Sequence, residues 1–303
     1  MKIVEAHNLF LADCQNGRLR QRSSVTLANY RNAFRVLIKW FPSLREVSSF
    51  NEDIARRFLR RGEEQNGWKP ASVVAYRKNL GAFIEWCKKH GHLESDPFQN
   101  LPWPLLAKGE PQYYVKEEIE KLMWVVSIKA SSNLNAKRDQ AILAVLLLAG
   151  LRRGELISLK ITDVDLGEEC LRIRAETAKN RSSRTIKMTF RLKEILQDYW
   201  KARQEAGIET PWFWISTTYK NHRLTKDGLK HLVDRLSRLT GFRFKPHKCR
   251  HTFATEFYEA SHDIVGLQAV LGHKDITTTM VYTSVKSDHL AASMEKNPLN
   301  QMI

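Results

Sequence analysis

The chain has few cysteines and no long apolar stretch, and these two absences exclude several classes of protein. Its four cysteines are scattered over 303 residues without a C-x-x-C pair, so we expect reduced thiols rather than a disulfide framework or a clustered zinc site. No stretch approaches the length of a membrane-spanning helix, and the first residues show no signal-peptide pattern. The sequence therefore predicts a cytoplasmic protein that has no membrane partner.

Acidic residues are too few to balance the basic ones. The chain has 49 lysines and arginines against 33 aspartates and glutamates, which gives a formal net charge of +16. A surplus of this size attracts a polyanion, and nucleic acid is the obvious candidate. The hydrophobic content of 43% indicates globular folding, and the length favours two domains over one.

The first hundred residues carry two basic amphipathic helices. Apolar residues recur at helical spacing over residues 25–41 and 70–91, and a further helix is predicted over 51–61. Their polar faces are positively charged and could grip the DNA backbone, although an ordinary solvated bundle is the alternative. The candidate DNA-binding residues are Arg31, Arg35, Lys39, Arg77 and Lys78.

A cluster of four prolines between positions 97 and 111 interrupts regular structure and indicates an interdomain connection. We expect residues 1–108 to form a helical N-terminal domain and residues 109–303 a second domain. The fold class is mainly α, because the second domain combines many helices with a small antiparallel sheet. Its helices are expected over 115–128, 191–206, 224–239, 247–260 and 264–271, and its strands around 171–174 and 184–188.

The last third of the chain carries side chains suited to phosphate chemistry. His247 and Arg250 lie three apart in PHKCRHTFAT, so on a helix both could point at one anion while His251 points elsewhere. Arg152 follows the apolar run 141–149, which places a second guanidinium at the edge of the core. Two such groups stabilise the charge that builds on a phosphodiester during in-line attack, without needing a metal.

A tyrosine near the carboxyl end is suited to be the nucleophile. Tyr282 follows His273 by nine residues, and its hydroxyl could attack phosphorus and keep the phosphate as a covalent ester. The energy of the cut bond is then kept, so cutting stays reversible.

At these residues the sequence resembles the tyrosine recombinases, the phage integrase and Xer-like family of site-specific DNA recombinases. The resemblance places the first arginine box at Gly150-Leu151-Arg152, the His-x-x-Arg-His box at 247–251, and the Leu-Gly-His box at 271–273. It implies strand cutting and rejoining through a 3′-phosphotyrosine, with no cofactor. The implied catalytic residues are Arg152, Lys179, His247, Arg250, His273 and Tyr282, supported by Glu155 and His251.

The resemblance also implies the catalytic role of each residue. His247 would accept the tyrosine's proton and His273 would hydrogen-bond the phosphate. The family lysine that protonates the departing 5′ hydroxyl matches Lys179 in AKNRSSRTIKM, where Arg181, Arg184 and Lys187 compete for the place.

His251 has two interpretations. It is predicted to be a structural or hydrogen-bonding residue near the phosphate. Its pairing with Cys249 as half of a metal site is the weaker alternative, because zinc needs further well-spaced ligands.

The implied partners are double-stranded DNA with specific recombination sites and three further copies of the chain, because the family works as a tetramer on DNA. Residues 287–294 could form a short helix, and the family's C-terminal segment commonly docks on a neighbouring protomer.

Two other functions remain open from the sequence. A type IB topoisomerase-like or telomere-resolving enzyme shares the arginine and tyrosine set, and only a recombinase would pair two defined sites. A non-catalytic DNA-binding regulator would use its charge for attachment alone. The complete set of motifs favours the recombinase.

Overall fold

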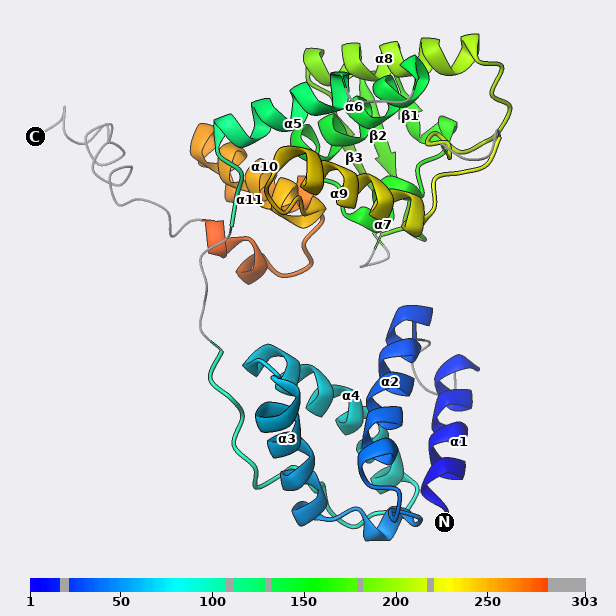
Figure 1. The fold of residues 1–303 in the computed structure, drawn as a ribbon, viewed down its shortest axis with the longest axis vertical. Coiled ribbons are helices and arrows are strands. Elements are labelled where there is room, and N and C mark those ends of the chain that lie inside the picture. Colours follow the sequence, from blue (N-terminus) through cyan, green and yellow to red (C-terminus); the bar gives the residue numbers. More distant parts are fainter. Residues whose placement is uncertain (17–21, 107–111, 129–131, 179–181, 217–220, 283–303) are drawn as a thin grey trace, which may run out of the picture. The chain divides into compact units, whose positions relative to one another are not determined.

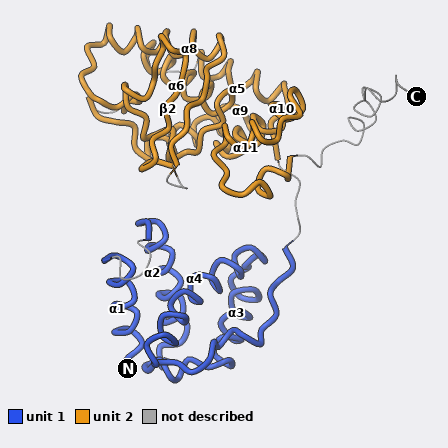
Figure 2. The backbone as a smooth tube through the Cα atoms, turned by 180° about the vertical axis from the view of Figure 1, so that it is seen from behind, with its two compact units in different colours: residues 1–108 blue, residues 109–303 orange. Residues whose placement is uncertain are grey.

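The computed structural model describes the chain except for residues 17–21, 107–111, 129–131, 179–181, 217–220 and 283–303. The chain divides into two compact units, residues 1–108 and 109–303 (Figure 2). Each unit has its own hydrophobic core. In the described part of the chain, no helix has both the length and the apolar character needed to cross a membrane.

Unit 1 is a bundle of helices (Figure 1). Side-chain caps mark two helix starts, because Ser23 accepts from the amide of Thr26 and Asn51 from that of Ile54. Pro70 occupies the first turn of a third helix, where it costs no hydrogen bond. The elements are α1 (Ile3–Gln15), α2 (Ser24–Trp40), η1 (Val47–Ser49), α3 (Glu52–Asn66) and α4 (Pro70–Lys89).

Helix α1 is absent from the sequence-based prediction. Its start has no side-chain cap, and a histidine interrupts the apolar pattern of its buried face. That residue, His7, is only 4% exposed and stacks on Phe34 with ring centroids 3.8 Å apart. A polar side chain thus occupies a core position that only the tertiary packing identifies.

The placement of Arg77 does not favour its predicted role in DNA binding. Its side chain is buried, at 5% exposure, and its guanidinium donates to the carbonyls of Phe98, Leu101 and Pro102 at 2.5, 2.7 and 3.0 Å. It also lies over the ring of Trp103, 3.9 Å from the centroid. Arg77 therefore fastens the segment that follows the bundle. The other four candidates, Arg31, Arg35, Lys39 and Lys78, are exposed.

Unit 2 is built around one helix whose C-terminal half is buried. The helix α6 (Asn133–Leu148) packs against α5 (Lys116–Ile128), α8 (Phe190–Glu205) and α10 (Pro246–Ser261). Its residues 141–147 are all buried, as expected for an apolar run that has no polar face. The other helical elements described in unit 2 are α7 (Arg153–Ile157), η2 (Ile161–Asp163), α9 (Lys226–Thr240), α11 (Ile264–Leu271), η3 (Ile276–Thr278) and η4 (Met280–Tyr282).

A small antiparallel sheet completes this unit. Its order is β1 (Val164–Asp165), β2 (Cys170–Ile173) and β3 (Arg184–Lys187), and Leu171 pairs with Ile186 in the centre of the second hairpin. This confirms the predicted fold class and both predicted strands, and adds the short β1. The end of α11 contacts β3, so this sheet edge lies beside the segment that leads to the tyrosine.

Candidate active site

The candidate residues reach one place from four separate segments. Arg152 caps α7, Arg250 and His251 lie on α10, His273 follows α11, and Tyr282 ends η4. The turn at Gly150 makes this possible, because its positive φ of 59° ends the buried run and brings Arg152 to the start of α7. A Cβ atom at Gly150 would also meet the ring of Phe253 at 2.5 Å.

The site is built around a buried carboxylate, Glu155, which is 2% exposed. Arg152 donates to it from Nη1 at 2.9 Å and from its backbone amide at 3.0 Å. Arg184 donates to both carboxylate oxygens, at 3.0 and 2.7 Å. Burial acts to raise the pKa of Glu155, but the hydrogen bonds and charge of Arg184, with the hydrogen bonds of Arg152, bring it below its usual value.

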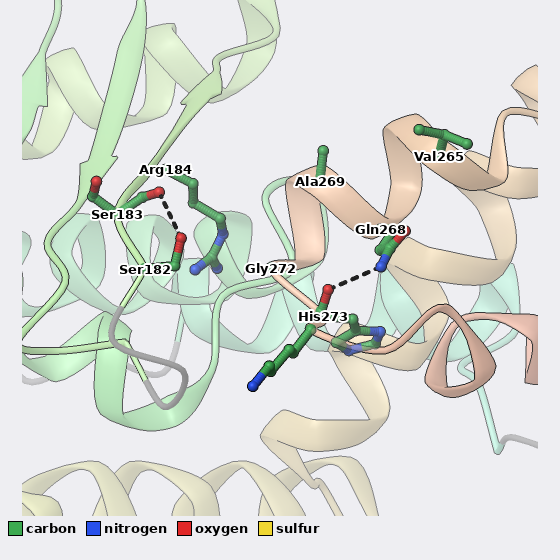
Figure 3. A pocket seen from close by; sticks show the side chains of 9 residues that line it. Ser182, Ser183, Arg184, Val265, Gln268, Ala269, Gly272 and His273 are labelled. Atoms are coloured by element: carbon green, nitrogen blue, oxygen red, sulfur yellow. Dashed lines mark hydrogen bonds between the residues drawn. The ribbon is translucent and has the colours of Figure 1, made fainter.

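Sequence reasoning treats Arg184 only as a competitor for the family lysine. The structure shows that this β3 residue also donates from Nε to the carbonyl of Val270 at 2.7 Å. Figure 3 shows it beside Gly272, and a Cβ atom at that glycine would lie 3.0 Å from its Nη1. The glycine of the Leu-Gly-His box therefore leaves room for Arg184 and places its own carbonyl 3.2 Å from Arg152 Nη2.

Arg250 is the most deeply buried of the positive groups around Glu155, at 2% exposure. It donates to the carbonyls of Gly150 and Leu271, both at 2.7 Å, and to Nε2 of His273 at 3.0 Å. Burial and then the charge of Arg152 lower the pKa of Arg250. Its contacts join α10 to the turn before α7 and to the end of α11.

The hydrogen bonds of His273 determine its tautomer. Because a guanidinium can only donate, Nε2 is the acceptor and the ring proton lies on Nδ1, which donates to Thr279 Oγ1 at 2.9 Å. Burial, followed by the charges of Arg250, Arg152 and Arg184, lowers the pKa of His273 to about 4. The neutral ring thus links the arginine cluster to the segment before Tyr282.

Tyr282 is buried at 3% exposure, against Ala254, Leu267 and Leu271. The hydroxyl of Tyr282 lies 2.7 Å from Nδ1 of His251. Burial raises the pKa of Tyr282, and the charge of Arg250 opposes this rise. The sequence analysis expects His251 to point away from the side chains that bind the anion. In the structure it instead points at the hydroxyl of Tyr282. Residues i and i+4 share a helix face, and the ring centroids of His247 and His251 lie 4.4 Å apart.

A cleft of about 830 Å³ opens beside the cluster. Arg152 and His247 line it together with the basic side chains of Arg153, Arg243 and Lys245. A second hollow, of about 580 Å³, lies between β3 and α11, with Arg184 and His273 in its lining (Figure 3). The side chain of Arg152 is 22% exposed, so it is accessible to an anion in the first cleft.

The structure thus brings together Arg152, Glu155, Arg250, His251, His273 and Tyr282, while His247 touches His251 and lines the cleft. Lys179 lies outside the described residues. Cys249 is fully buried in the core of unit 2, away from the His251 bond to the tyrosine. Among the described residues, no group of three or more His, Cys, Asp or Glu side chains could hold a metal ion.

Comparison with known proteins gives a consistent family. The Phage integrase family matches residues 113–289. Tyrosine recombinase XerC of Proteus mirabilis is 29% identical over 275 residues, covering 90% of this chain and 87% of the relative. Tyrosine recombinase XerD of Listeria monocytogenes is 30% identical over 226 residues, covering 73% and 74%.

Solved structures of the same fold include two proteins in complex with DNA. XerH site-specific recombinase bound to its difH substrate gives a TM-score of 0.70 at 20% identity, covering 95% of this chain and 83% of that one. The Tn1549 transposon integrase with a circular intermediate DNA gives 0.74 at 18% identity, covering 96% and 99%.

Proposed function

Because the chain belongs to the phage integrase family and is a site-specific tyrosine recombinase, we propose that Tyr282 is the residue that becomes joined to DNA. Its hydroxyl oxygen attacks the scissile phosphorus, and the bond from phosphorus to the 5′ oxygen breaks. The result is a 3′-phosphotyrosine and a free 5′ hydroxyl. Attack by a 5′ hydroxyl from a second site then rejoins the strands and releases the tyrosine.

The observation that carries this proposal is the convergence of positive charge beside a buried tyrosine. Arg152 has five N–H donors, and its bonds to Glu155 and Gly272 leave donors for a phosphate in the cleft. Arg250 adds a second charge from within the protein. Such fixed donors stabilise developing charge without reorganisation during the reaction.

The other site residues hold or complete this arrangement. Glu155 positions Arg152 through two bonds, and His247 lines the phosphate cleft. His273 reaches the phosphate when Nε2 becomes a donor, which requires a second proton or the other tautomer. Lys179 remains the proposed acid for the 5′ oxygen, by its family resemblance.

The test is covalent trapping on a nicked suicide duplex. Such a duplex is obtained by selecting, from a randomised DNA pool, sequences that trap the wild-type chain covalently. Tyr282→Phe should bind this duplex with unchanged affinity but form no adduct, because it lacks the attacking oxygen. An adduct formed by the variant would exclude Tyr282 as the nucleophile.

We further propose that the whole chain works on double-stranded DNA as a tetramer in the cytoplasm. The exposed residues Arg31, Arg35, Lys39 and Lys78 of unit 1 would contact the DNA backbone. Removing residues 284–303 should weaken assembly on DNA more than binding to a single site. Equal assembly by the truncated chain would argue against a docking role for that segment.

The topoisomerase-like and regulator alternatives are not favoured, because the relatives that cover most of this chain are tyrosine recombinases.

A further inference from the structure

We propose that His251 takes the proton from the hydroxyl of Tyr282 when the tyrosine attacks DNA. The inference rests on the proposed function, in which Tyr282 is the nucleophile. It differs from the role implied by the sequence resemblance, in which His247 accepts this proton.

The geometry of the hydroxyl points to His251. Nδ1 of His251 lies 2.7 Å from Oη of Tyr282, within the range of a short hydrogen bond. The tyrosine is 3% exposed, so bulk water has almost no access to it. The group already bonded to this hydroxyl, and so placed to take its proton, is His251.

The surroundings of His251 keep its ring able to accept a proton. Among the described residues, the charged and titratable groups that face it are His247 and Arg250 from α10 and Tyr282 from η4. Burial, followed by His247 and Arg250, lowers the pKa of His251 to about 4. The ring is neutral near pH 7, and one of its nitrogens carries a free lone pair.

The proton transfer balances with the bond changes at phosphorus. As the Oη–P bond forms and the bond from phosphorus to the 5′ oxygen breaks, the proton moves from Oη to Nδ1 of His251. The 5′ oxygen leaves with its electron pair and takes a proton from Lys179, the proposed acid. A phosphodiester bound beside Arg250 offsets the positive charge that disfavours a protonated His251, so the ring becomes more basic when substrate is present.

His247 provides a matched control one helical turn away. It is exposed and lines the cleft with Arg152, whereas His251 touches the tyrosine. We infer that the first histidine acts on the phosphate side and the second on the nucleophile.

The experiment compares His251→Asn with His247→Asn in the full chain on the selected suicide duplex. Asparagine keeps an oxygen that can accept a hydrogen bond near the position of Nδ1, but it cannot carry the proton away. Adduct formation by H251N in a single turnover should fall about 100-fold at neutral pH, the usual size of a general-base effect. The deficit should shrink as pH rises, because hydroxide can replace the lost base.

A second measurement separates proton transfer from packing. A fluorinated tyrosine at position 282, with a lower hydroxyl pKa, should recover much of the rate of H251N and none of the rate of Arg152→Ala. H247N should lose rate without this recovery. Unchanged cleavage by H251N, or a loss that is equal at every pH and is not recovered by fluorotyrosine, would overturn the proposal. An adduct formed by Tyr282→Phe would instead overturn the proposed function.

Discussion

The two units use arginine in opposite ways. On α3 of unit 1, Arg56, Arg57 and Arg60 are at least 58% exposed and pair with carboxylates one helical turn away. Water screens such pairs, so each contributes little to stability. In unit 2, Arg152 and Arg184 bracket a carboxylate that water hardly reaches. Both sets are pairs of arginine with a carboxylate, so burial is the difference that lets the pairs of Glu155 hold a site in place.

Arg77 shows that the contrast follows burial and not the unit. It belongs to unit 1, is buried, and is satisfied by three carbonyls in place of a carboxylate. Its charge stays in a largely apolar environment because the guanidinium fork finds acceptors in the chain that follows the bundle. Each of the following changes tests this comparison at a different level of burial.

The largest effect is expected from Glu155→Gln. Removing the buried negative charge leaves Arg152, Arg184 and Arg250 uncompensated, and breaking a buried pair in this way costs about 3 to 5 kcal/mol. Chemical denaturation of the full chain should show this loss in unit 2, and adduct formation should fall with it. The matched control, Glu64→Gln on α3, should stay within about 0.5 kcal/mol of the parent. Equal losses in the two variants would remove the distinction between the pairs.

Arg77→Met should destabilise unit 1 by about 3 kcal/mol, because buried carbonyls lose charge-assisted hydrogen bonds. Hydrogen exchange of the α4 amides in the full chain would report this loss. Arg77→Lys should recover only part of it, since an ammonium cannot reproduce the fork or the contact with Trp103. If the main effect were a smaller salt dependence of DNA binding, Arg77 would be a phosphate contact after all.

Acid should weaken unit 1 through His7. Burial, with a smaller contribution from Arg31, lowers its pKa to about 4 from 6.5, so the unfolded chain binds the extra proton first. The contribution of neutral His7 to the free energy of unfolding is fully present above pH 6.5. It falls by up to about 3 kcal/mol as pH drops to 4, and His7 causes no further loss below that pH. His7→Phe should flatten the pH dependence of exchange in α1. An unchanged slope in the variant would assign the effect to other groups.

The smallest effect on stability is expected from the double variant Arg35→Ala and Lys39→Ala, because both side chains are exposed on α2. Its free energy of unfolding should change by less than about 0.5 kcal/mol. The salt dependence of DNA binding should weaken instead, by a slope of roughly 1 for each lost phosphate contact. Titrations at several salt concentrations would measure this, with Glu63→Gln as a control on an exposed face of α3. An unchanged slope would place the DNA surface of unit 1 elsewhere.

Much of the fold is predictable because local patterns and tertiary packing agree. Helix α11 begins and ends where its apolar pattern does, from Asp263 as the cap to Gly272 with positive φ. Helix α1 escapes prediction because its core position 7 is a histidine. The partnership of Arg184 with Glu155 escapes because 29 residues separate them, and no local spacing relates a strand residue to a helix start.

The sequence by itself determined which chemical groups the site contains, since the spacing of Arg152, His247, Arg250, His273 and Tyr282 needs no coordinates. Only the tertiary structure decided which of them touch. It buried Arg77, gave Glu155 its second arginine, and placed His251 on the tyrosine hydroxyl. The reason is physical: residue type fixes charge and hydrogen-bonding capacity, whereas burial and long-range contacts set the partner and the pKa.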